Sequence, residues 1–250
     1  MKNSFILNFI LLALLLSPFS LQAGCSDEAK AGVNWTGCDK SNLDLSGVDL
    51  QSAVLRRVNF SNTNLSKARL QSADLTFSTL DNTNFVKARM ERARLNNAKI
   101  SNADFSMAVL DEARFSRAII KQTNFKSSRL NKTDFYEAQV EAGMFEKAQL
   151  EKANFSRAKL VAANFTKVTA IAAIFDQANL EEANFSEADL NSAKLVEASL
   201  LSVNFNKANL SAASIQGAEI DGASFEGTKL SSTIWVKYQR CRNGSVGVCN

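Results

Sequence analysis

Four cysteines are the residues whose chemistry is easiest to define in this sequence, and they lie near its two ends. Cys25 and Cys38 come early, and Cys241 and Cys249 come last. Four cysteines allow three disulfide pairings. Zinc sites usually combine closely spaced cysteines with histidine, whereas this chain has no histidine and no CxxC spacing. We therefore expect disulfides, and no metal or other cofactor.

Catalytic arrangements are hard to assemble from this composition. A Ser-His-Asp triad needs a histidine, and the chain contains none. Adjacent carboxylates occur at Asp111 with Glu112 and at Glu181 with Glu182, but paired acids on a surface are more often simply solvated. The segment GSVG at 244–247 lies between two cysteines and is more simply a turn than a phosphate-binding loop. We predict that the protein is not an enzyme and binds no small-molecule substrate.

The first 23 residues have the composition of a secretory signal peptide. One lysine precedes an apolar run over residues 5–16, and the small residue Ala23 ends the segment LQA. Such a segment is removed on export, which leaves the mature protein periplasmic or secreted, where disulfides persist. We expect cleavage after Ala23. A lipoprotein signal ending at Cys25 is less favoured, because such signals prefer leucine where Gln22 stands.

The elements that carry these residues follow from an unusual repeat. From Leu45 to Trp235 every fifth residue is apolar, and the residue two positions earlier is usually small. A helix would spread residues five apart around its surface, and a strand would turn every second one towards water. A short repeat of fixed length is instead typical of a solenoid, in which each unit turns the chain by the same angle.

The type of apolar residue repeats every twenty positions. Phenylalanine occupies one series from Phe85 to Phe225 and a second from Phe115 to Phe175, each at intervals of twenty residues. Aliphatic residues occupy the two series between them. Four five-residue units therefore complete one turn of the chain, and like side chains stack along the axis.

This pattern resembles the pentapeptide-repeat family, whose unit places Ala two positions before a central Leu or Phe, with Asp or Asn between them. The segments ADL at 73–75, ADF at 103–105 and ANF at 153–155 match it directly. The resemblance implies an all-β fold, a right-handed quadrilateral β-helix of about ten coils over residues 41–236. Arginine replaces the central Asp or Asn at several positions: Arg69, Arg89, Arg94, Arg114 and Arg129.

The expected shape decides how the cysteines pair. Coils spaced about 4.8 Å apart would form a rod about 45 Å long, whereas a disulfide needs Cα atoms within about 7 Å of each other. Each cysteine should therefore pair with its neighbour in the sequence. This gives an N-terminal disulfide cap at residues 24–40 and a C-terminal disulfide cap at residues 237–250. Trp35 and Trp235 are placed to cover the apolar core at the two ends.

Charge is distributed unevenly along the expected rod. The chain carries a formal charge of +4, which is too little to predict nucleic-acid binding. The charged residues of segment 176–226 are mostly acidic, nine Asp or Glu against two lysines. Charge runs usually serve solubility; a functional basic stripe would instead bind an unknown protein or an anionic envelope surface. We define the basic stripe as five residues expected along one corner: Lys67, Arg69, Lys87, Arg89 and Arg129.

The sequence thus predicts an exported, non-enzymatic structural or protein-interaction scaffold that presents the side of a rigid rod. Some members of the resembled family imitate DNA and bind a topoisomerase, which is the alternative that the resemblance implies. That role requires an acidic rod in the cytoplasm, so the positive charge and the signal peptide disfavour it. We expect neither nucleic acid binding nor a membrane span in the mature chain.

Overall fold

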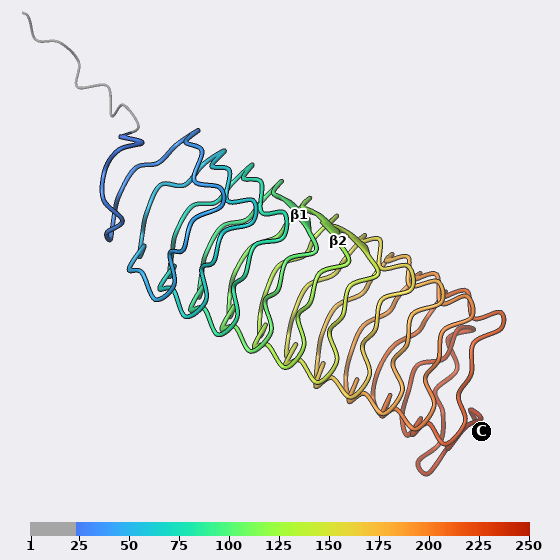
Figure 1. Cartoon of the computed structure of the whole chain (residues 1–250). Coiled ribbons are helices and arrows are strands. Elements are labelled where there is room, and N and C mark those ends of the chain that lie inside the picture. The colour runs from blue at the N-terminus through green and yellow to red at the C-terminus, as the bar shows by residue number, and fades with distance from the viewer. Residues whose placement is uncertain (1–23) are drawn as a thin grey trace, which may run out of the picture.

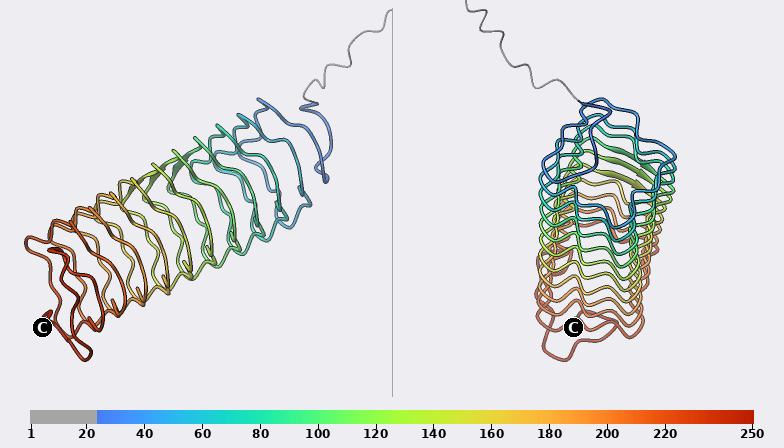
Figure 2. Two further views of the ribbon diagram at one scale, coloured as in Figure 1. Left: turned by 180° about the vertical axis from the view of Figure 1, so that it is seen from behind. Right: turned by 60° about the vertical axis from the view of Figure 1, so that its left-hand side comes forward.

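The computed structural model describes residues 24–250, and the predicted signal peptide at 1–23 lies outside them. The described chain winds into a right-handed, four-sided β-helix, seen as a rod of stacked coils (Figure 1 and Figure 2). Residues twenty positions apart pair as parallel bridges, from Asn34 with Val54 to Ser214 with Ile234. The fold class predicted from the five-residue repeat is therefore confirmed.

One side of three successive coils pairs over more than single residues. β1 (Lys99–Ser101), β2 (Ile119–Lys121) and β3 (Gln139–Glu141) form a parallel sheet in the order β1-β2-β3. The central residue of each strand is buried and the first is exposed. Elsewhere within residues 24–250 the coils are joined by isolated bridges, because the chain turns again after three extended residues.

Each corner of a coil is a tight turn with an unusual backbone conformation. At most corners the N–H of the residue after the turn donates to the carbonyl of the apolar residue before it, as Val48 does to Leu45 at 3.3 Å. The second turn residue has positive φ, which is 68° at Gly47 and 61° at Phe77. Residues other than glycine rarely adopt this region. Hydrogen bonds between coils are therefore needed to hold the corners in place.

The Asp or Asn before the central apolar residue acts on the next corner. Its side-chain oxygen accepts a hydrogen bond from the N–H of the first turn residue, as Asn59 does from Ser61 at 3.1 Å and Asp104 from Ser106 at 2.8 Å. Polar side chains of this length favour such local bonds to the backbone. The Asp or Asn of the repeat thus gives the turn N–H an acceptor within its own unit.

Several units lack this Asp or Asn, and in five of them a side chain of the preceding coil supplies the acceptor. The N–H of Asn131, two residues after Arg129, donates to the carboxylate of Asp111 at 3.1 Å. A basic or neutral residue can thus replace the family's Asp or Asn while the turn N–H stays paired. In four other pairs the turn N–H likewise donates to a side-chain oxygen of the residue twenty positions earlier: Ser101–Asp81, Glu151–Asn131, Val196–Asp176 and Glu226–Asn206.

The interior of the rod is a stack of apolar side chains. Rings twenty residues apart lie nearly parallel, with ring centres 4.6 Å apart for Phe85 and Phe105 and 4.7 Å for Phe135 and Phe155. The two phenylalanine series meet edge to face, at distances of 5.5 to 6.0 Å. Every central residue from 50 to 215 is at most 1% exposed. The phenylalanine columns predicted from the sequence are confirmed.

The coil begins earlier than the predicted boundary at residue 41. Asn34 and Asp39 already form parallel bridges to the next coil. Trp35 occupies the central position of a side and is 1% exposed. The predicted N-terminal cap at 24–40 therefore contains the first sides of the β-helix. The apolar pattern hides this, because Lys40 stands where the next central apolar residue would be.

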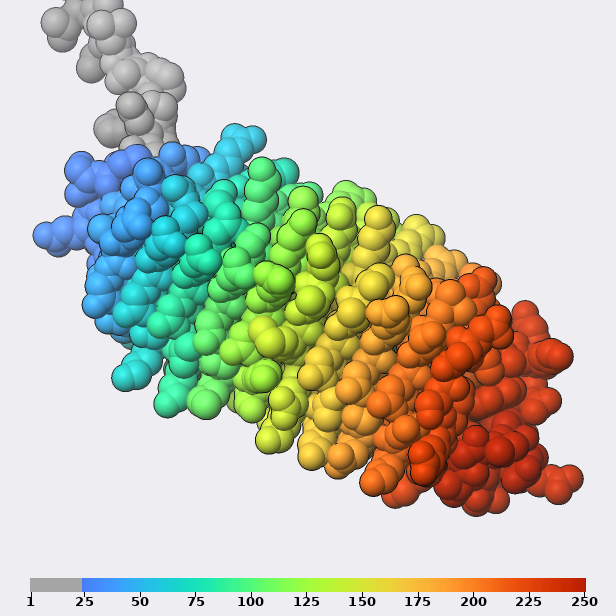
Figure 3. Space-filling model, turned by 45° about the vertical axis from the view of Figure 1, so that its right-hand side comes forward, coloured from blue at the N-terminus to red at the C-terminus, as the bar shows by residue number. Residues whose placement is uncertain are grey.

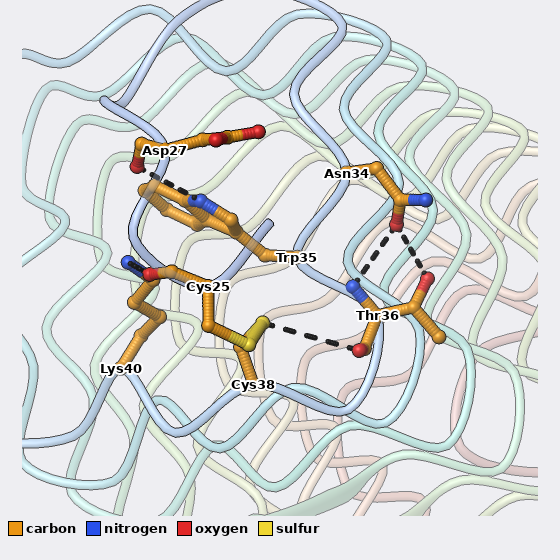
Figure 4. The surroundings of a disulfide bond; sticks show 7 residues. All are labelled: Cys25, Asp27, Asn34, Trp35, Thr36, Cys38 and Lys40. Carbon is orange, nitrogen blue, oxygen red and sulfur yellow. Dashed lines mark hydrogen bonds between the residues drawn. A yellow bond between two sulfur atoms is a disulfide. The ribbon is translucent and has the colours of Figure 1, made fainter. Parts of the chain in front are cut away.

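At the N-terminal end, a disulfide joins Cys25 and Cys38 beside Trp35 (Figure 4), with Cα atoms 5.4 Å apart. The indole N–H of Trp35 donates to the carbonyl oxygen of Asp27 at 3.2 Å. The Nζ of Lys40 lies 4.0 Å from the indole ring centre and donates to the carbonyl of Cys25. These contacts tie the first described residues across the end of the rod and bury the tryptophan.

At the C-terminal end, Cys241 and Cys249 form the second disulfide, with Cα atoms 4.8 Å apart. Both cysteine pairs therefore join neighbours in the sequence, as the rod length predicts. Trp235 packs on Phe225 with ring centres 5.1 Å apart. Trp235 remains partly exposed, so it covers this end less completely than Trp35 covers the other.

The stacked core makes a direct prediction about stability. Phe145 is fully buried, with the rings of Phe125 and Phe165 centred 4.9 and 4.7 Å away. The substitution Phe145→Ala should lower the free energy of unfolding by about 3–5 kcal/mol, because it removes buried surface and leaves a cavity. Denaturant unfolding measures this change. The control Phe77→Ala, at a side chain that is 54% exposed, should shift it by at most about 0.5 kcal/mol. Equal effects would contradict the stacked core.

Candidate interaction surface

The basic stripe occupies one corner and the side that follows it. Lys67 and Lys87 are second turn residues with φ of 59° on neighbouring coils. Arg69 and Arg89 lie on the adjacent side, where their backbones bridge each other, and the column continues through Val109 to Arg129. All five basic residues are exposed. Figure 3 shows how side chains of successive coils line up along the rod. The structure thus brings the five predicted residues onto one surface.

Carboxylates lie against three of these five cations. Such exposed ion pairs contribute about 0–1 kcal/mol each, but they reduce the positive charge that a partner would meet. Lys67 and Lys87 form no ion pair with any residue between 24 and 250, so the unpaired charge is concentrated at this corner. The three pairs are Arg69 with Asp49 (Nη1 to Oδ2, 3.4 Å), Arg89 with Glu91 (Nη2 to Oε1, 2.9 Å) and Arg129 with Asp111.

The turn that contains Asp49 favours the ionised form of this acid beside the stripe. The backbone N–H of Gln51 and then its side-chain amide lower the pKa of Asp49 below its usual value, and Arg69 adds to this. Asp111 contacts Arg129, and the carboxylate of Glu112 lies 3.3 Å from the Nε of Arg92. The adjacent acids Asp111 and Glu112 are thus engaged in ion pairs on the outside of the rod.

A second cluster, centred on Asp74, lies on another side of the rod. Asp74 is 3% exposed and is the one charged residue that is buried within residues 24–250. Its carboxylate accepts hydrogen bonds from the Nε of Arg56 and the Oγ1 of Thr76, both at 2.5 Å. The Nη2 of Arg94 lies 3.2 Å from the same carboxylate. One acid therefore holds the guanidinium groups of the coils before and after it.

Opposing influences act on the Asp74 carboxyl. Burial by itself would raise the pKa of Asp74, because it disfavours the charged form. Hydrogen bonds from Thr76 and Arg56, together with the charge of Arg94, outweigh burial and hold the pKa below its usual value. Asp74 is consequently ionised at neutral pH and offsets part of the charge of both arginines.

An exposed aromatic ring lies beside this cluster. Phe77 is 54% exposed, and the guanidinium carbon of Arg57 lies 5.8 Å from its ring centre. Arg56, Arg94 and Phe77 are among the residues that line a hollow of about 320 Å³. Two departures from the repeat could have indicated this cluster in the sequence. Phe77 places an aromatic ring at a turn position, and the neighbouring surface column changes from acidic Asp74 to basic Arg94 on the next coil. The hollow offers guanidinium and aromatic contacts to a binding partner.

Two further structural findings concern residues 24–250. No group of three or more Cys, Asp or Glu side chains is arranged there to hold a metal ion. In the same residues no helix has the length and apolar character needed to cross a membrane.

The Asp74 cluster predicts a pH-dependent contribution to stability. Asp74→Asn should lower the free energy of unfolding at neutral pH by about 1–3 kcal/mol, because it removes charged hydrogen bonds. The folded-state pKa lies below the ordinary value of 3.8, so this contribution is present above about pH 4 and is lost as the pH falls through the folded pKa. Denaturant unfolding of both proteins between pH 7 and pH 2 measures the difference. A difference that grows in acid would contradict this assignment.

Comparison with known proteins supports the repeat architecture. The family model described as a pentapeptide repeat region matches residues 98–171 and 152–225. The model described as pentapeptide repeats (8 copies) matches residues 44–76 and 68–106. No curated protein matches the chain by sequence. Together the two family models extend over the coils from residue 44 to residue 225.

Solved structures with the same architecture include HetL, a pentapeptide repeat protein involved in heterocyst differentiation regulation from the cyanobacterium Nostoc sp. strain PCC 7120. HetL is 25% identical, with a TM-score of 0.64, over 85% of this chain and 93% of HetL. A trypsin-treated form of QnrB1, a plasmid-mediated fluoroquinolone resistance protein, is 17% identical over 78% of this chain and 90% of QnrB1, with a TM-score of 0.43. Because a family model alone matches residues 98–225 and the coils show the repeat in three dimensions, the chain belongs to the pentapeptide-repeat family.

Proposed function

We propose that this protein is an exported, non-enzymatic scaffold that presents the side of its rod to another protein or to an anionic envelope surface. The observation that carries the proposal is the corner formed by Lys67 and Lys87. These lysines occupy equivalent turn positions on neighbouring coils and are exposed. Within residues 24–250 neither has an ion-pair partner. Pentapeptide-repeat proteins are in general structural or interaction scaffolds, which agrees with this role.

The coil geometry suits such a surface. Stacked rings in the core repeat at 4.6 to 5.4 Å from coil to coil, so equivalent surface side chains are carried on a backbone with the same regular repeat. A surface that is already ordered loses little conformational freedom when a partner binds. The neighbouring arginines, each half-exposed and held by a carboxylate, would add directed hydrogen bonds at the rim of the lysine corner.

Export is supported by the two disulfides, because such bonds persist in oxidising compartments. Cleavage after Ala23 would begin the mature protein at Gly24, directly before the segment that is tied across the first coil. A lipid thioether would use the sulfur of Cys25 that bonds Cys38, so the disulfide and lipidation exclude each other. We therefore propose a periplasmic or secreted protein without a lipid anchor at Cys25.

A DNA-mimicking, topoisomerase-binding role has less support in this chain. A protein that imitates DNA needs rows of negative charge along its sides. Here Arg69 and Arg89 follow each other on one side, and Arg94 and Arg114 follow each other on another. A surface that binds DNA phosphates is positively charged, so the arginine columns would repel it instead of binding to it as DNA does.

The proposed processing predicts the mass of the native protein. Protein isolated from cells that export it should have the mass of residues 24–250, and it should be lighter by four hydrogens than the same protein after reduction. The reason is that export removes the signal peptide and leaves two intact disulfides. Intact-mass spectrometry with and without reductant measures both. Retained residues 1–23, an added lipid mass or an unchanged mass on reduction would contradict the proposal.

The lysine corner predicts a charge-dependent interaction. The double variant K67E/K87E should recover at least about fivefold less of the specific envelope partner, or bind at least about fivefold less to phosphatidylglycerol vesicles, because it reverses unpaired charges at the contact. Quantitative pull-down from envelope fractions and vesicle co-sedimentation are the two measurements.

The matched control for that variant is K147E/K167E. Lys147 and Lys167 lie in the same turn column, but each already has a glutamate within 4 Å, at 3.8 Å for Glu146 and 3.6 Å for Glu187. This control should retain binding close to that of the unchanged protein. If both variants bind alike, or if no partner and no vesicle binds the unchanged protein, the lysine corner is not an interaction site.

A further inference from the structure

The C-terminal cap covers only part of the last complete coil. The terminal segment folds back across the end of the rod (Figure 1) and pairs with residues 228–235. Leu230 and Ser232 donate their N–H groups to the carbonyls of Ser245 and Cys241, at 2.9 and 3.1 Å. In return, the N–H of Gly247 donates to the carbonyl of Thr228 at 2.9 Å. These bonds cover two of the four sides, the ones that contain Leu230 and Trp235.

The other two sides end in an unpaired backbone edge, which we call the open edge (residues 218–225). One coil earlier, the N–H groups of Leu200 and Ser202 donate to the carbonyls of residues 219 and 221, at 2.7 and 2.9 Å. The equivalent N–H groups of Ile220 and Gly222 have no acceptor within residues 24–250, and neither does that of Phe225. In the same part of the chain the carbonyls of residues 218 and 223 receive no hydrogen bond. In chain order the free groups along this edge are the carbonyl of residue 218, the N–H groups of Ile220 and Gly222, the carbonyl of residue 223 and the N–H of Phe225, on either side of the corner that the Ala223 N–H closes onto the Ile220 carbonyl at 3.0 Å.

The apolar core is also uncovered at the open edge. Ile220, Ala223 and Phe225 are all partly exposed, whereas the equivalent residues one coil earlier, Leu200, Val203 and Phe205, are 0% exposed. The cap stops beside this edge. A Cβ atom placed on Gly247 would lie 3.5 Å from the carbonyl oxygen of Phe225, and the residues on either side of it, Val246 and Val248, are 55% and 64% exposed.

We propose that the open edge binds an extended, basic segment of a partner protein, which adds as a further strand to the end of the rod. An exposed strand edge is a template for such pairing, in which main-chain hydrogen bonds give affinity and side-chain pockets give selectivity. Apolar side chains of the segment would cover Ile220 and Phe225. This site is separate from the lysine corner and goes beyond the scaffold function proposed above.

The charge around the open edge selects a basic occupant. Three acids stand on or beside these two sides in the last coil, and none forms an ion pair with any residue between 24 and 250. Lysine or arginine at alternate positions of the segment would lie near them while the intervening apolar residues face the core. The three acids are Glu219, Asp221 and Glu226.

A second copy of this chain is a poorer occupant. If a second copy stacked end to end in register, its first coil would offer the carbonyls of Asp39 and Ser41, which accept no backbone hydrogen bond from residues 24–250, to the N–H groups of the open edge. These residues share the twenty-residue columns of Glu219 and Asp221. The same register would place the carboxylate of Asp39 over that of Glu219. Like charges directly opposite each other across a ladder are destabilising, so the ends repel each other and leave the edge free for a basic segment.

A synthetic heptapeptide of alternating lysine and valine, fluorescently labelled, is the probe for this site. It should bind the full protein saturably in anisotropy titrations. At saturation, amide exchange measured by NMR should slow at least about tenfold at Ile220 and Gly222, because their N–H groups gain acceptors. The same peptide with N-methyl groups on alternate residues lacks the donors for this edge and should not bind.

Charge reversal at the edge provides the matched test. E219K/D221K should weaken binding of the probe at least about tenfold, because it removes two attractive charges and adds two repulsive ones. E187K/E197K makes the same charge change on other columns and should keep the affinity within about twofold. K67E/K87E should also bind normally, which separates this site from the lysine corner.

Any one of three results would overturn the proposal. The first is that the peptide binds without slowing exchange at Ile220 and Gly222, and the second is that E219K/D221K binds the peptide as tightly as the unchanged protein does. The third is that the N-methylated peptide binds as well as the unmodified one. Slow exchange at these amides without peptide, together with a concentration-dependent dimer in sedimentation, would assign the edge to a second copy instead.

Discussion

A parallel ladder of hydrogen bonds, which pairs residues twenty positions apart, holds every other feature of this rod in place. The turn residues at the corners lie at positive φ, which most side chains disfavour, and a single coil has no internal sheet to hold them. Stacking the coils satisfies their backbone groups and places each fifth residue on the axis. Phenylalanine then packs on phenylalanine in one column and meets the second column edge to face.

The same ladder decides what the outer surface can do. It aligns equivalent side chains of neighbouring coils, so one acid can hold two arginines, as Asp74 does, and unpaired lysines can stand side by side, as Lys67 and Lys87 do. It also explains how arginine can replace the family's Asp or Asn at position 129, since Asp111 one coil earlier accepts from the turn N–H of Asn131. Where the ladder ends, at Ile220 and Gly222, the unpaired groups become a binding surface.

The sequence was sufficient to predict the fold and the ends but not the details of the surface. The five- and twenty-residue periods predict the square coil and the phenylalanine columns, and rod length alone pairs the cysteines. Trp35 was assigned to a cap because Lys40 interrupts the apolar pattern. The pairing of Arg69, Arg89 and Arg129 with acids, and the burial of Asp74, depend on side-chain directions that periodicity does not fix. The sequence therefore identifies the residues of the basic stripe but neither their ion pairs nor the neighbouring cluster.

The central claim, that one continuous ladder at a spacing of twenty residues organises the protein, is tested most directly by native-state amide hydrogen exchange along the whole chain. We predict slow exchange that repeats every five residues from residue 53 to residue 215, at the central apolar position, the second turn residue and the bridging residue of each unit. Exchange that lacks this period, or slow exchange confined to the units containing phenylalanine, would contradict it.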